Sequence, residues 1–138
     1  MIQKITVDIT TTFAKGASTK GAVFLGLGGR EFRLDIDDHD DFHEGDEVSY
    51  VFGVAANVLF PDRNDPRKGL PLSLGDATRH PVYIRLEPQA KQDDWEVANV
   101  RVRVAALSGN VAFAALQGGD ERLWLGRESG TILHLRAV

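Results

Sequence analysis

Hydrophobic and polar residues alternate along much of the chain. Ile5, Val7 and Ile9 alternate with threonine and aspartate, which is typical of a strand that buries one face. Within 97–104, valines alternate with Arg101 and Arg103, so a slip of one residue would bury both guanidinium groups. The sequence predicts strands at 2–13, 20–27, 30–36, 47–53, 81–87, 95–105, 110–115, 121–126 and 131–136.

Glycine-containing turn signals separate the predicted strands. They lie at 15–16, 28–29, 44–46, 108–110, 118–120 and 129–130. No segment shows a convincing helical period. Many short strands joined by glycine-rich turns predict an all-β domain, either a sandwich or a barrel.

The segment 54–80 breaks this pattern. It contains Pro61, Pro66 and Pro71 and a polar run at 62–65, with isolated apolar residues between them. We expect a long loop inserted between two strands. Loops of this length without secondary structure are uncommon in compact domains, and they are often functional or disordered.

The composition predicts one folded domain over residues 1–138. The chain has 138 residues, of which 43% are hydrophobic and none is cysteine; this is the size of a single domain. Without cysteine, thiol catalysis and cysteine-ligated metals are excluded. The sequence also lacks a long apolar run and a signal-peptide pattern, so we expect a cytoplasmic protein.

The charge is unevenly distributed. The net charge is −4, and eight of the 20 acidic residues fall between 35 and 47, where no lysine or arginine occurs. The remainder has 12 acidic and 16 basic residues, a net charge of +4. An overall acidic chain is not expected to bind nucleic acid.

Several short blocks follow one another in a characteristic order. They are KGAVFLGL from Lys20, FRL from Phe32, DFHEGDE from Asp41, VYIRL from Val82, DWEVANVRV from Asp94 and LWLG from Leu123. Together they resemble a PLAT domain, the family named for polycystin, lipoxygenase and alpha-toxin. The resemblance implies an antiparallel eight-stranded β-sandwich, here with a long inserted loop at about 54–80.

The same resemblance implies a binding module rather than an enzyme. Its partner would be a membrane lipid or a protein; the sequence leaves the oligomeric state open. No G-x-S-x-G elbow or Walker loop is present. The glycine-rich stretch 26–29 is followed by a predicted strand and not by a helix, so it is a hairpin turn and not a dinucleotide loop. We therefore expect no enzymatic activity.

The acidic loop is a candidate calcium site. Calcium takes six to eight oxygen ligands, and some PLAT domains resemble calcium-dependent membrane binders. The candidate ligands are Asp37, Asp38, Asp40 and Asp41. The alternative is a solvated acidic loop that keeps one end of a sheet soluble.

The inserted loop supplies candidate residues for lipid or partner binding. Apolar side chains interleave there with basic ones, a combination that suits an anionic lipid surface or a partner's groove. The candidates are Leu59, Phe60, Arg63, Arg67, Lys68 and Leu70. Alternatively, the loop folds back and covers an edge or a face of the sandwich.

A carbohydrate-binding sandwich is the other functional class that the sequence leaves open. Its aromatic side chains would stack on sugar rings, and the candidates are Trp95, Trp124 and Tyr83. For both tryptophans, packing in the core or at a sheet edge is the alternative role.

Overall fold

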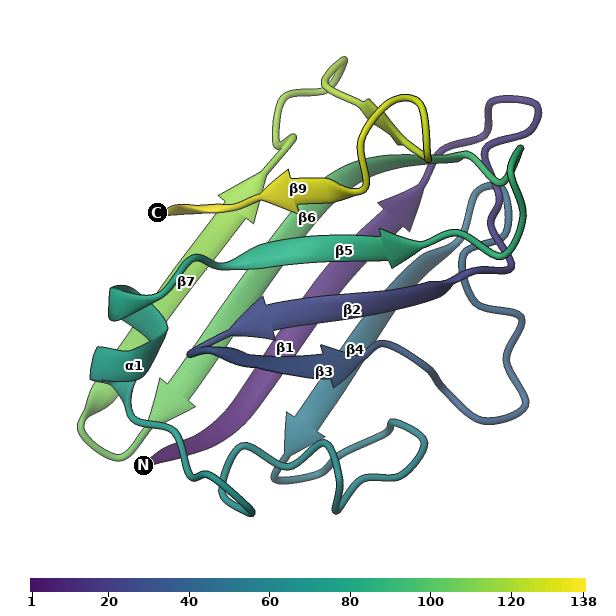
Figure 1. The fold of residues 1–138 in the computed structure, drawn as a ribbon. Coiled ribbons are helices and arrows are strands. Elements are labelled where there is room, and N and C mark those ends of the chain that lie inside the picture. Colours follow the sequence, from purple (N-terminus) through teal and green to yellow (C-terminus); the bar gives the residue numbers. More distant parts are fainter.

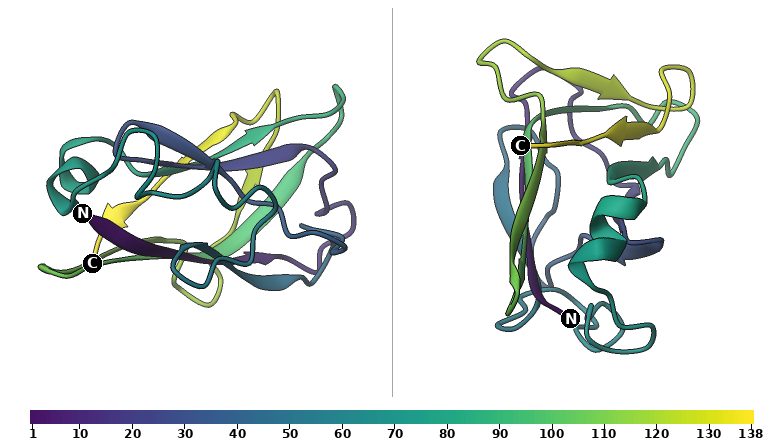
Figure 2. Two further views of the ribbon diagram at one scale, coloured as in Figure 1. Left: turned by 90° about the horizontal axis from the view of Figure 1, so that it is seen from below. Right: turned by 90° about the vertical axis from the view of Figure 1, so that its left-hand side faces the viewer.

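The structure, a computed structural model that describes residues 1–138, is a sandwich of two antiparallel sheets (Figure 1). The first sheet contains, in spatial order, β10 (Arg136–Ala137), β7 (Gly109–Ala115), β6 (Trp95–Ala106), β1 (Ile2–Thr11) and β4 (Glu47–Gly53), with β8 (Leu123–Leu125) paired to the start of β6. The second sheet contains β3 (Arg30–Arg33), β2 (Ala22–Leu27), β5 (Tyr83–Glu87) and β9 (Ile132–His134). Figure 2 shows the two layers facing each other. The predicted all-β antiparallel sandwich is confirmed.

The hydrophobic core fills the space between the two sheets. Val7 of β1 lies opposite Tyr50 of β4 on one side and Val102 of β6 on the other, and all three are fully buried. Arg101 and Arg103 of β6 are exposed, as the alternation predicts. Because each large apolar side chain contributes about 1.5–3 kcal/mol when it is buried, this alternation fixes which face of each strand points inward.

The segment 54–80 is not wholly irregular, because it contains the helix α1 (Leu74–Arg79). The Ser73 hydroxyl accepts a hydrogen bond from the Asp76 nitrogen at 3.2 Å, and the Asp76 carboxylate accepts one from the Ser73 nitrogen at 2.9 Å. This capping box starts the helix. The expectation of no helix was wrong here, because a helix of six residues is too short to show a period. No helix in the structure is long and apolar enough to span a membrane.

The rest of the inserted segment, residues 54–73, covers one open side of the sandwich. Asn57 pairs with the free edge of β4: its Oδ1 accepts from the Val51 nitrogen at 2.8 Å, and its Nδ2 donates to the Ser49 carbonyl at 2.8 Å. Asn64 accepts from the backbone nitrogen of Arg33 in β3 at 2.9 Å. Exposed strand edges invite pairing with other chains, so these two asparagines protect both sheets on this side.

Arg30, at the start of β3, holds the second half of this segment. Its Nη1 donates to the backbone carbonyls of Asp65, Lys68 and Leu70 at 3.0–3.2 Å. The Asp65 carboxylate, itself buried, accepts from Arg67 at 2.9 Å and 3.0 Å. The segment is thus fixed to both ends of β3, which is four residues long. Of the two roles considered for the inserted loop, the structure shows that it folds back and covers an edge of the sandwich.

Candidate functional site

The acidic loop, residues 34–46 between β3 and β4, lies at the end of the sandwich where β1 ends and β2 begins (Figure 1). It contacts the loop between those two strands. The Thr19 nitrogen donates to the Phe42 carbonyl at 3.2 Å, and the Gly16 nitrogen donates to Glu44 Oε1 at 3.0 Å. Two loops far apart in the sequence therefore form one surface.

Phe42 anchors the acidic loop in the core. Its ring is 3% exposed, stacks on Tyr50 with 5.7 Å between centroids, and meets Trp95 edge-on at 5.2 Å. Phe42 has a positive φ of 62°, so the backbone turns sharply there. Beside the buried ring, Asp41 is half-buried and Asp40 is exposed.

A small polar cavity of about 160 Å³ opens beside this anchor. Its charged lining residues are Lys20, Arg33, Asp35, Asp40 and Asp41. The structure therefore brings two of the four predicted metal ligands, Asp40 and Asp41, to one cavity. It adds Asp35, which the sequence did not single out.

Each carboxylate that lines the cavity already has a partner. Asp40 lies 2.6 Å from Lys20 Nζ, and this contact lowers the pKa of Asp40. Arg33 Nε lies 3.7 Å from Asp35 Oδ2. Asp41 accepts from the Tyr50 hydroxyl at 2.7 Å and from the Ile36 nitrogen at 3.3 Å.

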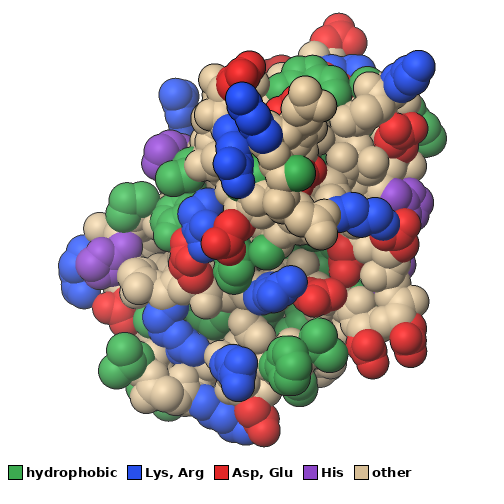
Figure 3. All heavy atoms as spheres, turned by 45° about the vertical axis from the view of Figure 1, so that its right-hand side comes forward, with side chains coloured by type: hydrophobic (Ala, Val, Ile, Leu, Met, Phe, Trp, Pro, Cys, Tyr) green, Lys and Arg blue, Asp and Glu red, His purple; other side chains and the backbone are tan.

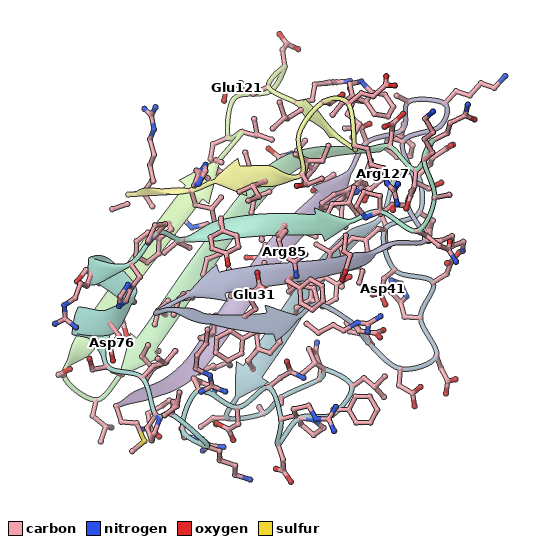
Figure 4. The ribbon with its side chains drawn as sticks, viewed as in Figure 1. Glu31, Asp41, Asp76, Arg85, Glu121 and Arg127 are labelled. Atoms are coloured by element: carbon pink, nitrogen blue, oxygen red, sulfur yellow. The ribbon has the colours of Figure 1, made fainter.

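Burial and the neighbouring Asp35 raise the pKa of Asp41, and they outweigh the two hydrogen bonds that it accepts. Burial and Asp41 raise the pKa of Tyr50. Figure 4 shows Asp41 at the loop end of the sandwich. The Tyr50–Asp41 hydrogen bond ties this part of the acidic loop to the middle of β4.

Asp37 and Asp38, the other two predicted ligands, do not line the cavity. Both are exposed, and neither side chain makes a hydrogen bond or an ion pair. No group of three or more histidine, aspartate or glutamate side chains is arranged to hold a metal ion. Since calcium needs several converging oxygens, the aspartates in this arrangement do not fit it.

The residues predicted for lipid or partner binding divide into two groups. Leu59 and Arg67 are half-buried, and Arg67 forms an ion pair with Asp65. The other four are exposed, and we call them the excursion surface: Phe60, Arg63, Lys68 and Leu70. Figure 3 shows hydrophobic and basic side chains intermixed over the lower part of the molecule, with acidic and histidine side chains along the right-hand edge.

Phe60 and Leu70 are the apolar residues of the excursion surface, with exposed fractions of 57% and 76%. The Arg63 guanidinium lies over the Phe60 ring, 5.3 Å from its centroid, and forms no ion pair. Lys68 is paired with Asp62 at 2.6 Å. Phe60 has a positive φ of 52°, an uncommon backbone conformation for an aromatic residue.

The excursion surface adjoins the acidic loop. The Leu59 nitrogen donates to the Asp35 carbonyl at 2.9 Å, one residue before Phe60. The Arg33 nitrogen donates to Asn64 at one end of β3, and the Arg30 side chain at the other end donates to the Leu70 carbonyl. The two halves of the surface are therefore held at opposite ends of this strand.

The structure excludes one residue from the carbohydrate hypothesis. Trp95 is fully buried, and its Nε1 donates to the Thr11 hydroxyl at 2.8 Å, so it cannot stack on a sugar. Trp124 is 36% exposed. The Tyr83 hydroxyl donates to Glu31 at 2.8 Å, and Arg85 donates to the same carboxylate at 2.8 Å (Figure 4). The hydroxyl of Tyr83 therefore already has a hydrogen-bond partner within the protein.

One exposed aromatic residue escaped the sequence reasoning. Phe13, in the loop after β1, is 86% exposed and lies against Gly45 of the acidic loop. The sequence analysis placed it at the end of the predicted strand 2–13. Only the end of β1 at Thr11, two residues earlier, would have identified it as a loop residue.

Sequence comparison finds no matching family model and no matching curated protein. Comparison with solved structures does find matches. A lipoxygenase in complex with arachidonate has a TM-score of 0.58 at 14% identity, over 98% of this chain and 16% of that chain. The alpha-toxin of Clostridium absonum has a TM-score of 0.59 at 19% identity, over 98% of this chain and 31% of that one.

This chain has the PLAT fold. Coral 8R-lipoxygenase, whose calcium activation is attributed to a C2-like domain, matches with a TM-score of 0.58 at 16% identity, over 97% of this chain and 17% of that chain. The expected PLAT-like sandwich is therefore confirmed at the level of the fold. The chain spans about a sixth of these lipoxygenases and about a third of the toxin.

Proposed function

We propose that this PLAT-fold chain is a non-enzymatic binding module that attaches to a lipid surface through the excursion surface. The observation that supports this most directly is the exposure of Phe60 beneath an unpaired Arg63. An exposed aromatic ring can enter the interfacial region of a bilayer, while the guanidinium contacts lipid phosphates.

The rigidity of the segment supports the same proposal. Asn64 and Arg30 fix its backbone to β3, so Phe60 and Leu70 stay exposed without a change in the fold. A preformed binding surface loses little conformational entropy when it binds. Each basic residue near an anionic membrane adds about 1 kcal/mol of attraction, and Arg63 has no acidic partner that would cancel it.

Calcium dependence stays a prediction. The calcium activation of the coral 8R-lipoxygenase favours it, whereas the arrangement of Asp40 and Asp41 does not. The acidic loop adjoins the excursion surface and would repel anionic lipid, so neutral and anionic membranes are expected to differ.

Liposome flotation tests the proposal. The purified protein is mixed with neutral or anionic vesicles, each with calcium or with a chelator. We expect the protein to float with vesicles in at least one lipid composition. If it stays in solution under all four conditions, lipid attachment is wrong and a protein partner becomes the hypothesis to test.

A further inference from the structure

We propose that the outer face of the first sheet carries a second binding site, for an amphiphilic anion with a carboxylate or phosphate head and a short apolar body. This site lies on β6 and β7, on the face opposite the core. It goes beyond the proposed lipid attachment and shares no residue with the excursion surface.

The register of β6 and β7 shapes the site. Arg101 lies opposite Ala114, and Arg103 lies opposite Ala112. Directly opposite residues of antiparallel strands project from the same face, and the intervening Val102 is fully buried, so all four project outward. Long arginine side chains on one strand thus stand beside methyl groups on the next.

A hollow of about 510 Å³ lies beside Arg101, Arg103 and Ala112, whereas Ala114 is 5% exposed and does not line it. Thr78 of α1 and Val138 at the end of the chain also line it, and Ala105 adds to its apolar surface. Ligand pockets for small molecules range from about 300 to 1,000 Å³. The hollow therefore has room for a small amphiphile.

The charge of the hollow selects an anion. Arg101 and Arg103 are the only residues with charged side chains in its lining. Arg103 Nη2 donates to Asp8 at 2.8 Å, and Asp8 also accepts from the Ser49 hydroxyl. Although Arg101 lies opposite Asp8 in the ladder, its guanidinium forms no hydrogen bond or ion pair.

An unpaired guanidinium beside an apolar floor defines the ligand chemistry. The guanidinium fork matches the paired oxygens of a carboxylate or phosphate, and the alanine methyl groups suit a hydrocarbon body. Arg101 is the only cationic side chain of the hollow without an acidic partner, so the head group of such a ligand is expected to bind there.

Titration followed by amide NMR shifts tests this site on the whole chain. The probes are octanoate and octyl phosphate below their micellar concentrations, with octanol, acetate and inorganic phosphate as partial ligands. We expect saturable shifts in β6 and β7 with octanoate, octyl phosphate or both, and weaker responses to every partial ligand. If octanol binds as tightly as the charged probes, the proposal is wrong.

Three variants complete the test. Arg101→Gln is expected to weaken binding about tenfold, since it removes the charged hydrogen bond to the head group of the ligand. Ala112→Leu fills the hollow and should also weaken it. Arg127→Gln, an exposed arginine on the turn between β8 and β9 (Figure 4), is the matched control and should leave binding unchanged.

The proposal is overturned if no probe gives saturable shifts, if Arg101→Gln or Ala112→Leu binds as the parent does, or if Arg127→Gln loses as much affinity as Arg101→Gln. Phe60→Ala separates the two proposals. It is expected to leave octanoate binding unchanged while it weakens flotation with liposomes.

Discussion

Asn64 Oδ1 accepts a hydrogen bond from the backbone nitrogen of Arg33 at 2.9 Å, and this bond joins the inserted segment to the free edge of β3. The Asn64 side chain also donates to the carbonyls of Leu59 and Phe60 at 3.3 Å and 3.1 Å. One nearly buried amide therefore closes the loop on itself and protects the edge of a sheet.

Asn64→Ala is expected to lower the free energy of unfolding by about 1–3 kcal/mol, because it leaves the part-buried Arg33 nitrogen and Leu59 carbonyl without their partner. Urea denaturation measures the change. Asn110→Ala is the matched control, because Asn110 is exposed and its side chain makes no hydrogen bond. Equal stability of the two variants would contradict the role assigned to Asn64.

Phe42 and Phe13 form a second matched pair in the two loops at the acidic end. Phe42→Ala removes a ring packed between Tyr50 and Trp95, and should cost about 3–5 kcal/mol. Phe13→Ala should change stability by about 0.5 kcal/mol or less, since the ring is 86% exposed. Thermal or urea unfolding measures the stability of both variants. If Phe42→Ala lost no more stability than Phe13→Ala, Phe42 would not be the anchor of the acidic loop.

The partly buried carboxyl of Asp41 predicts a dependence of stability on pH. Burial and Asp35 raise its folded pKa above the ordinary 3.8, so the folded state holds this proton more tightly than the unfolded chain does. Its contribution to stability is therefore present below 3.8 and is lost as the pH rises through the folded pKa.

Asp41→Asn cannot ionise and should not show this loss. The unfolding free energy of the variant, relative to the parent, is expected to rise with pH across that window and then level off. Leu107→Ala, which removes no ionisable group, serves as the control. A relative stability that falls with pH would show that the pKa of Asp41 is lowered, not raised.

The Tyr83–Glu31 contact is open to spectroscopic titration. Burial and the Glu31 carboxylate raise the pKa of Tyr83 above 10.0. Glu31→Gln should lower that pKa, because it removes the negative charge at 2.8 Å from the hydroxyl. Phenolate absorbance measures the shift. Glu121→Gln, on a loop elsewhere (Figure 4), should leave it unchanged; an unaltered pKa in Glu31→Gln would contradict the contact.

The alternation of residues predicted the sandwich because strand burial is a local property of the sequence. Val100, Val102 and Val104 are buried and Arg101 is exposed, as their spacing requires. The helix α1 was missed because its capping box, not a hydrophobic period, defines it.

The candidate site was less predictable, because neighbouring loop residues diverge. Asp37 and Asp38 lie close to Asp40 and Asp41 in the sequence, yet they are exposed and do not line the cavity that those residues share with Asp35. The roles of Asn57 and Asn64 depend on backbone groups of β4 and β3 that only the tertiary fold brings near.

Flotation of two matched variants tests the central claim most directly. Phe60→Ala removes the ring of the excursion surface, and Leu107→Ala removes a side chain that is 95% exposed in the turn between β6 and β7. In the lipid composition that binds the parent, we predict about tenfold weaker binding for Phe60→Ala and no change for Leu107→Ala. Equal flotation of both variants and the parent would show that the excursion surface is not the membrane contact.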